Sequence, residues 1–183
     1  TPDELNELQR EQYDRIASGR EPREDGQLGG PFDPWIRSPE LARRAFAFGG
    51  YVWERTTLDR GIVELAIIVT ARYWRSNVEW VAHAATARRY GISQTVIDSV
   101  FNQQRPNESS EEILTADDFC RVLHETKDVP REIYDRSVGL FGEQGVMELI
   151  ATIGYYTMVS MTLNAFAIET QGGEEPFPRD SAS

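Results

Sequence analysis

The chain has 183 residues, of which 19 are Lys or Arg and 30 are Asp or Glu, giving a net charge of −11. This length suits one domain with a buried core, and the negative charge argues against nucleic acid or an anionic membrane surface as a partner. The single cysteine, Cys120, excludes an intramolecular disulfide and a two-thiol redox cycle within one chain. No apolar stretch is long and unbroken enough to predict a membrane span and no signal segment opens the sequence, so we expect a cytoplasmic protein.

The first 37 residues are predicted to form an amphipathic helix and a loop. The stretch TPDELNELQREQYDRIASG has apolar side chains at helical spacing, with Thr1 as a candidate cap and Gly19 as the stop. The next stretch, REPREDGQLGGPFDPWIR, is rich in glycine, proline and charge. Because it also contains Phe32, Trp35 and Ile36, we expect this loop to pack against the body of the protein.

The central part of the chain contains three predicted helices. Ser38 followed by Pro39 is typical of a helix start. A second helix begins near Asp59 and runs through RGIVELAIIVTARYW, which is apolar enough to be buried on most sides. The third begins near Ser76 and ends at Gly91. We assign three aromatic side chains of the first of these helices to the core, namely Phe46, Phe48 and Trp53.

The C-terminal part adds four predicted helices. Ser93 caps QTVIDSVF, and Ser109 with Glu112 forms a capping-box pattern at the next helix, EEILTADDFCRVLHETKD. Pro130 opens REIYDRSVGLFG, and GEQGVMELIATIGYYTMVSMTLNAFAIET is the last long helix. His124 lies among charged residues and is expected to be exposed.

The pattern as a whole predicts an all-α protein, since no run of alternating residues between turn signals indicates strands. We expect one domain over residues 1–183, with a core at about 38–168 and a tail at 172–183. The pentapeptides GIVEL and GVMEL each open a long apolar helix and predict an internally duplicated helical hairpin. The positions equivalent to Glu79 and His83 in the second copy are Leu163 and Ala167, so we expect only the first copy to carry a polar pair.

Three side chains form the candidate catalytic site. Glu64 lies in an apolar helix, where a carboxylate is either on a narrow solvent-exposed stripe or buried with a partner. Glu79 and His83 are four residues apart and therefore share a helix face, either as a surface pair or as part of a site. The neighbouring tryptophans and alanines favour a partly buried histidine, which could give and accept protons near neutral pH.

Further residues near this segment are candidate ligands of a substrate. Ser76 is most simply the N-cap of its helix, but the same helix end could also bind an anion or a carbonyl oxygen. Arg72 and Arg75, one turn earlier, could assist binding or face solvent. Trp74 and Trp35 could line a pocket.

Together these residues resemble the carboxymuconolactone decarboxylase family, which includes the alkylhydroperoxidase D-like proteins. The resemblance covers about residues 38–168 and rests on RSPELARRAFAFGGYVWERTTLDRGIVELAIIVTARYW, SNVEWVAHAATARRYGIS and LFGEQGVMELIATIGYYTMVSMTLNAF. It implies an alkylhydroperoxidase D-like helical bundle and assembly as a homo-oligomer, a trimer or a hexamer. The resemblance also implies that the reaction requires no metal or organic cofactor.

The resemblance also separates two kinds of chemistry. In the peroxidase branch the motif contains a glutamate, a Cys-x-x-Cys pair and a histidine, which fall here on Glu64, on Ser76 and Glu79, and on His83. Both thiols are absent, so thiol peroxidase activity is not expected. The remaining acid–base groups resemble what the decarboxylase branch needs, and they imply a lyase or isomerase acting on a small carboxylated or enolisable substrate.

Two other functions stay open at this point. Glu64, Glu79 and His83 have a spacing that could bind a metal ion, although one histidine and two carboxylates are a thin ligand set for zinc. Alternatively, the protein is a non-catalytic binding or assembly protein that keeps the fold after loss of the cysteine pair.

Overall fold

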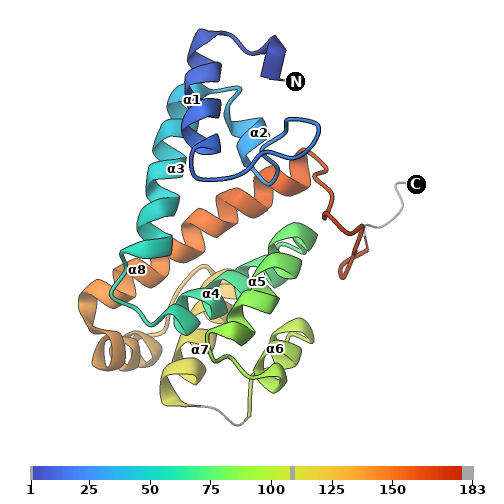
Figure 1. Cartoon of the computed structure of the whole chain (residues 1–183). Coiled ribbons are helices and arrows are strands. Elements are labelled where there is room, and N and C mark those ends of the chain that lie inside the picture. The colour runs from blue at the N-terminus through green and yellow to red at the C-terminus, as the bar shows by residue number, and fades with distance from the viewer. Residues whose placement is uncertain (1, 108–109, 179–183) are drawn as a thin grey trace.

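A computed structural model describes residues 2–107 and 110–178. All of the secondary structure in these residues is helical, as predicted, and the helices form one bundle (Figure 1). The elements are a 3₁₀-helix at Pro2–Glu4 and the helices α1 Glu7–Ala17, α2 Phe32–Trp35, α3 Pro39–Glu54, α4 Arg60–Tyr73, α5 Asn77–Arg89, α6 Gln94–Phe101, α7 Glu111–Thr126 and α8 Arg131–Ala165.

The N-terminal helix and the following loop pack against α3, which lies beside α1 in Figure 1. Thr1 lies outside the described residues, and α1 is capped instead by Asn6, whose side chain and that of Gln9 form a reciprocal capping box. Trp35 and Ile36 are buried, which confirms that the glycine-rich loop is attached to the body by its apolar side chains. The single turn of α2 inside this loop was not predicted.

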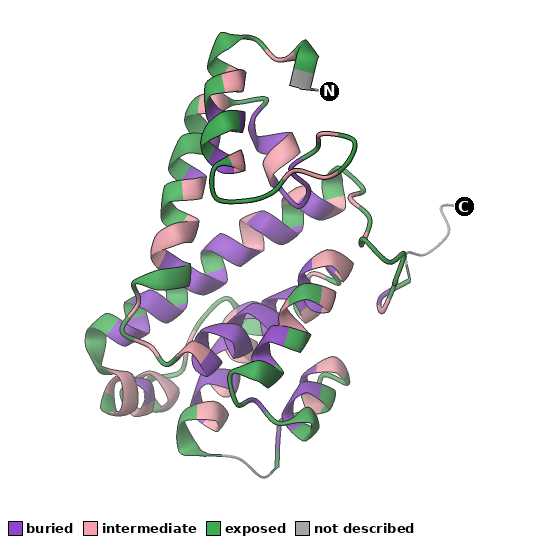
Figure 2. Ribbon diagram, in the orientation of Figure 1, coloured by how far each residue is buried: buried purple, intermediate pink, exposed green. Residues whose placement is uncertain are grey.

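Helix α4 is the centre of the bundle. Every residue from Gly61 to Ala71 is buried, and α4 contacts α5, α6, α7 and α8. Figure 2 shows buried residues concentrated on these inner helices. The side chain of Asp59 accepts a hydrogen bond from Gly61 N (2.8 Å) and so caps α4 at its predicted start. A carboxylate on this helix, such as that of Glu64, is therefore held in the protein interior.

Helix α8 consists of two helical segments. Gly142 has φ 70° and ψ 169°, a conformation that favours glycine, and it separates the two segments that the sequence predicts. By length and composition alone α8 is apolar enough to cross a membrane. However, it packs against α3, α4 and α7 and contains the buried Glu148, as expected of a core helix in a bundle.

The internal repeat does not form a second hairpin. In the first copy the chain turns between α4 and α5, where Arg75 has a φ of 50°. In the second copy α8 continues without a break through the equivalent residues to Ala165. The two glutamates nevertheless occupy similar environments, because Glu64 and Glu148 are both buried.

Several local expectations change in the structure. Ser109 lies outside the described residues, and the N-cap of α7 is Ser110, whose hydroxyl accepts from Ile113 N. The prediction of an exposed His124 is wrong, since its ring is buried and stacks on Tyr73. The assignment of Phe48 and Trp53 of α3 to the core is also wrong, because these residues are 41% and 42% exposed. Phe46, the third aromatic residue assigned to the core, is partly buried.

Candidate functional site

The predicted Glu64–His83 contact is present between α4 and α5. Nδ1 of His83 lies 2.7 Å from Oε2 of Glu64, which is a hydrogen-bonding distance. Glu64 has no exposed surface, and only 13% of the His83 side chain is exposed. The carboxylate therefore fixes the orientation of the imidazole from the interior side of the ring.

Glu79 lies on the other side of the same ring. Its Oε2 is 3.2 Å from Nε2 of His83, as the four-residue spacing on one helix predicts. This oxygen is buried and receives no aligned hydrogen bond from any described residue. The two glutamates thus flank the imidazole, with the less well satisfied one beside Nε2.

Arg60 extends this chain of charges and was missed by the sequence analysis. Its Nη2 donates a hydrogen bond to Oε1 of Glu64, one helical turn away. Its Nη1 donates to the carbonyl of Trp53 (2.8 Å), and its guanidinium carbon lies 3.4 Å from the centroid of the Trp53 ring. The spacing of Arg60 and Glu64 in α4 is the signal that could have revealed the pair. Arg60, Glu64, His83 and Glu79 form one continuous charged chain.

The charge of His83 follows from these neighbours. Burial alone would lower the pKa of His83 from its ordinary 6.5, but the hydrogen bond to Glu64 and the close negative charges of Glu64 and Glu79 outweigh burial and raise this pKa to about 9. At neutral pH the ring is therefore an imidazolium. Its resting state is that of a proton donor.

The imidazole and Glu79 line a cleft of about 580 Å³. Aromatic side chains from three parts of the chain surround the cleft, and the ring of Tyr156 lies 5.1 Å from that of His83 at a steep angle. Gly49 of α3 permits close approach of Tyr155, since a Cβ at this position would lie 2.2 Å from the tyrosine hydroxyl. The site thus offers a partly apolar space next to a proton donor, which suits a small planar molecule.

Three of the predicted site residues lie away from this cleft. Ser76 stands at the N-cap position of α5, but it has no exposed surface and its hydroxyl neither caps the helix nor bonds to any described residue. Trp74 donates to Thr157 (3.3 Å) and Trp35 donates to Thr162 (3.0 Å), both on α8. These placements argue against the predicted substrate contacts of all three side chains.

The two predicted arginines belong to a different surface. Arg72 donates to the carbonyl of Phe101 (2.6 Å) and Arg75 to that of Pro178 (2.6 Å). Both line a hollow beside the C-terminal segment, where Phe177 is buried. Arg72 and Arg75 therefore hold that segment against α6 and are not brought to the cleft of His83.

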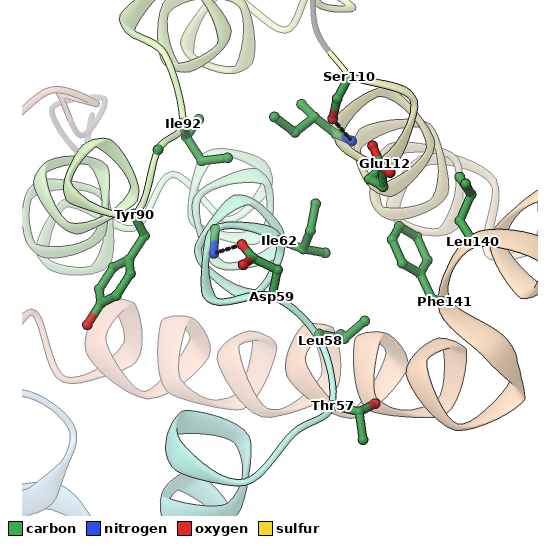
Figure 3. Close-up of a pocket in the computed structure, with 13 residues that line it drawn as sticks. Thr57, Leu58, Asp59, Ile62, Tyr90, Ile92, Ser110, Glu112, Leu140 and Phe141 are labelled. Carbon is green, nitrogen blue, oxygen red and sulfur yellow. Dashed lines mark hydrogen bonds between the residues drawn. The ribbon is translucent and has the colours of Figure 1, made fainter.

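A second hollow of similar size, about 540 Å³, lies between α4, α7 and the first segment of α8 (Figure 3). Two of its polar side chains act as helix caps: Asp59 accepts from Gly61 N, and Ser110 accepts from Ile113 N (3.4 Å). Neither histidine lines it. We therefore assign the acid–base chemistry to the cleft of His83, the one of the two hollows that contains a proton donor.

Metal and thiol chemistry find little support in the geometry. Among residues 2–107 and 110–178, no group of three His, Cys, Asp or Glu side chains is arranged so that it could hold a metal ion. Both ring nitrogens of His83 already face carboxylate oxygens. Cys120 has no exposed surface, and burial raises the pKa of its thiol, so it is not a reactive thiolate.

Comparisons with known proteins agree with this fold. The structure is similar to the crystal structure of a protein of unknown function from Agrobacterium tumefaciens, a putative antioxidant defence protein AhpD, with a TM-score of 0.65 and 13% sequence identity over 77% of this chain and 97% of that one. No curated protein matches. Residues 39–119, which include Glu64, Glu79 and His83, match the model of the carboxymuconolactone decarboxylase family. The resemblance of this chain to the carboxymuconolactone decarboxylase family, in its alkylhydroperoxidase D-like fold, is thereby confirmed.

Proposed function

We propose that the protein is a cofactor-free lyase or isomerase that acts on a small carboxylated or enolisable substrate. The observation that carries this proposal is the 2.7 Å contact between His83 and the buried Glu64, with the other side of the ring beside Glu79 and the cleft. The match to the carboxymuconolactone decarboxylase family supports a role of the kind found in that family. Glu64 and Glu79 beside His83 supply the acid–base groups that such a reaction needs.

In the proposed reaction His83 supplies the proton. When the carbon–carbon bond to a substrate carboxylate breaks, its electron pair stays on the substrate as a dienolate and carbon dioxide leaves. The Nε2 proton of the imidazolium then moves to carbon, which leaves a neutral imidazole that regains a proton from solvent. Glu64 holds Nδ1 throughout, and Glu79 stabilises the imidazolium at Nε2. An isomerase would use the same transfer without loss of carbon dioxide.

We further propose a cytoplasmic homo-oligomer, a trimer or a hexamer. The support is an apolar stripe along α8, which we define as Met147, Ile150 and Met161; each of these side chains is exposed, at helical spacing. Apolar side chains aligned on one face are typical of subunit contacts.

The experiment compares three single substitutions with the wild-type protein. Turnover is measured with carboxymuconolactone and with a set of small β-keto and unsaturated lactone acids, by release of carbon dioxide and by incorporation of deuterium at carbon from D₂O. We expect His83→Gln to abolish turnover and Glu64→Gln to reduce it strongly, with the helical circular-dichroism spectrum retained. Glu148→Gln is the matched control, because it changes the equivalent buried carboxylate of α8 and should keep turnover.

Two results would decide against the proposal. Full activity in His83→Gln would show that the imidazole is not the proton donor. Tight binding of an acid by the wild-type protein without any turnover or deuterium incorporation would favour the non-catalytic binding protein. A metal-dependent enzyme would instead lose its activity on treatment with a chelator and regain it with the metal.

A further inference from the structure

The loop between α1 and α2 forms one wall of the cleft that contains His83. Arg20, Arg23 and Gly30 of this loop line the cleft, as do Glu79 and His83 of α5. Figure 1 shows the same loop close to the end of α8. The loop lies outside residues 39–119, the region that matches the family model.

Arg23 is a cation without an acidic partner. Its Nε is buried and has no hydrogen-bond partner, and Arg23 forms no ion pair within the described part of the chain. The guanidinium lies against Gly29, where a Cβ would approach Nε to 2.8 Å and Nη2 to 2.9 Å. Gly29 also has a φ of 73°, so a side chain there would be strained as well as too close. The glycine thus makes room for a guanidinium whose hydrogen-bonding capacity remains unfilled.

Arg20 also lines the cleft and is held by the loop itself. Its Nε donates to the carbonyl of Leu28 (2.8 Å), and its guanidinium carbon lies 5.2 Å from the ring of Phe32. These contacts use the inner edge of the guanidinium. The Nη groups stay available for a ligand in the cleft.

The loop is fixed before any ligand binds. The hydroxyl of Tyr13 donates to the carbonyl of Gly26 (2.7 Å). The carboxylate of Asp33 accepts from the backbone N–H groups of Leu28 (2.9 Å) and Gly29 (2.7 Å), and Leu28 is buried. A cationic site on a fixed loop binds an anion at lower entropic cost than one on a mobile loop.

The other charged groups of the cleft are distributed over different elements. Glu54 at the end of α3 and Glu169 after α8 also line the cleft and are exposed, and Glu79 faces His83. The two arginines come from one short loop, whereas the acidic groups do not. The loop also contains Glu21, Glu24 and Asp25, but Arg20 and Arg23 are the charged side chains of this loop that line the cleft.

We propose that Arg23, assisted by Arg20, binds the carboxylate of a planar, unsaturated acid whose reacting carbon faces His83. The guanidinium groups provide the paired donors that a carboxylate accepts, and the aromatic side chains of the cleft pack against the planar part of the ligand. This assignment rests on the proposed function for the reaction at His83, but the binding of the anion does not depend on turnover. It replaces Arg72 and Arg75, which lie elsewhere, as the anion-binding residues of the site.

The test measures binding and needs no knowledge of the natural substrate. Calorimetry is performed with benzoate as the anionic probe and benzamide as a neutral probe of the same shape. We expect wild-type protein to prefer benzoate, and Arg23→Gln to weaken benzoate binding by about tenfold or more, as for loss of a charge-assisted hydrogen-bonded pair. Benzamide binding should not change. Arg15→Gln removes one positive charge from the exposed surface of α1 and is the matched control that should bind like wild type.

The outcomes separate this inference from the proposed function. If His83→Gln loses turnover but retains the preference for benzoate, while Arg23→Gln loses that preference, both proposals hold. If Arg23→Gln binds benzoate as wild type does, or if wild type has no preference for benzoate, the assignment of Arg23 is wrong whether or not His83 catalyses a reaction. An Arg23→Lys variant that recovers part of the affinity would support direct charge recognition over a structural role for Arg23.

Discussion

The protonation of His83 gives the sharpest test of the site. Its pKa of about 9 in the folded chain, against 6.5 for an ordinary histidine, corresponds to about 3 kcal/mol of folding free energy. The folded state binds this proton more tightly than the unfolded state. The stabilisation is therefore fully present below pH 6.5 and is lost as the pH rises from 6.5 to 9.

The perturbation removes one partner of the imidazole at a time. Glu64→Gln and Glu79→Gln should each lower the pKa of His83, because each takes away a negative charge next to one ring nitrogen. Glu148→Gln removes a buried carboxylate that has no histidine partner, so the pKa of His83 should stay at about 9 in that variant.

Two measurements follow the effect. Nuclear magnetic resonance titration of the ring protons should show one histidine that titrates near pH 9, and a His83→Gln variant assigns it. Denaturant unfolding at several pH values should give a stability difference between wild type and His83→Gln that shrinks by about 3 kcal/mol between pH 6.5 and 9. A His83 signal that titrates at or below 6.5 in wild-type protein would refute the reasoning, since burial would then outweigh both carboxylates.

Two further predictions concern other parts of the molecule. Burial and the charge of Lys127 lower the pKa of His124 to about 4, so the unfolded state binds this proton more tightly than the folded state. The free energy of unfolding should therefore fall by about 3 kcal/mol as the pH is lowered from 6.5 to 4. In His124→Gln this fall should be correspondingly smaller in denaturant unfolding, and an unchanged fall would contradict the assignment. For the proposed trimer or hexamer we expect light scattering to give three or six times the subunit mass of 20.8 kDa, and Ile150→Glu in the apolar stripe of α8 to lower this value. A monomeric wild-type protein would exclude the proposed assembly.

The fold followed from local patterns. Asp59, Ser93 and Pro39 lie where helices begin in the structure, because capping and proline preferences act within one turn of the chain. The Glu79–His83 proximity was also predictable, since a four-residue spacing on one helix fixes it. The exposure of Trp53 was not, because the surroundings of an aromatic ring depend on elements far away in the sequence.

The cations that line the cleft depend on tertiary contacts, which the spacing of residues along the sequence does not predict. Arg23 reaches the cleft because the loop before α2 folds back over Gly29, and nothing in a glycine-rich, charged stretch indicates which arginine will be turned inward. Arg72 and Arg75 were predicted to assist substrate binding, and the structure places both outside the cleft of His83. They are close to the motif in sequence, but Arg72 donates to the carbonyl of Phe101 in α6 and Arg75 to that of Pro178 in the C-terminal segment. Closeness along the chain was therefore a poor guide to which cations share the cleft with His83.

The two buried glutamates of the internal repeat show why the first is assigned to chemistry. Glu148 accepts hydrogen bonds from Thr57, Gln144 and Tyr51. Burial alone would raise the pKa of Glu148, but these donors lower it to about 2. None of these three partners titrates near neutral pH. Glu148 joins α3 and the connection between α3 and α4 to α8, and it can remain ionised throughout. Glu64 instead faces Arg60 on one oxygen and the imidazole of His83 on the other. A buried charged chain of this kind contributes little net stability compared with apolar packing. We therefore propose that Glu64 takes part in proton transfer, whereas the contacts of Glu148 are those of a structural carboxylate at the equivalent position of the repeat.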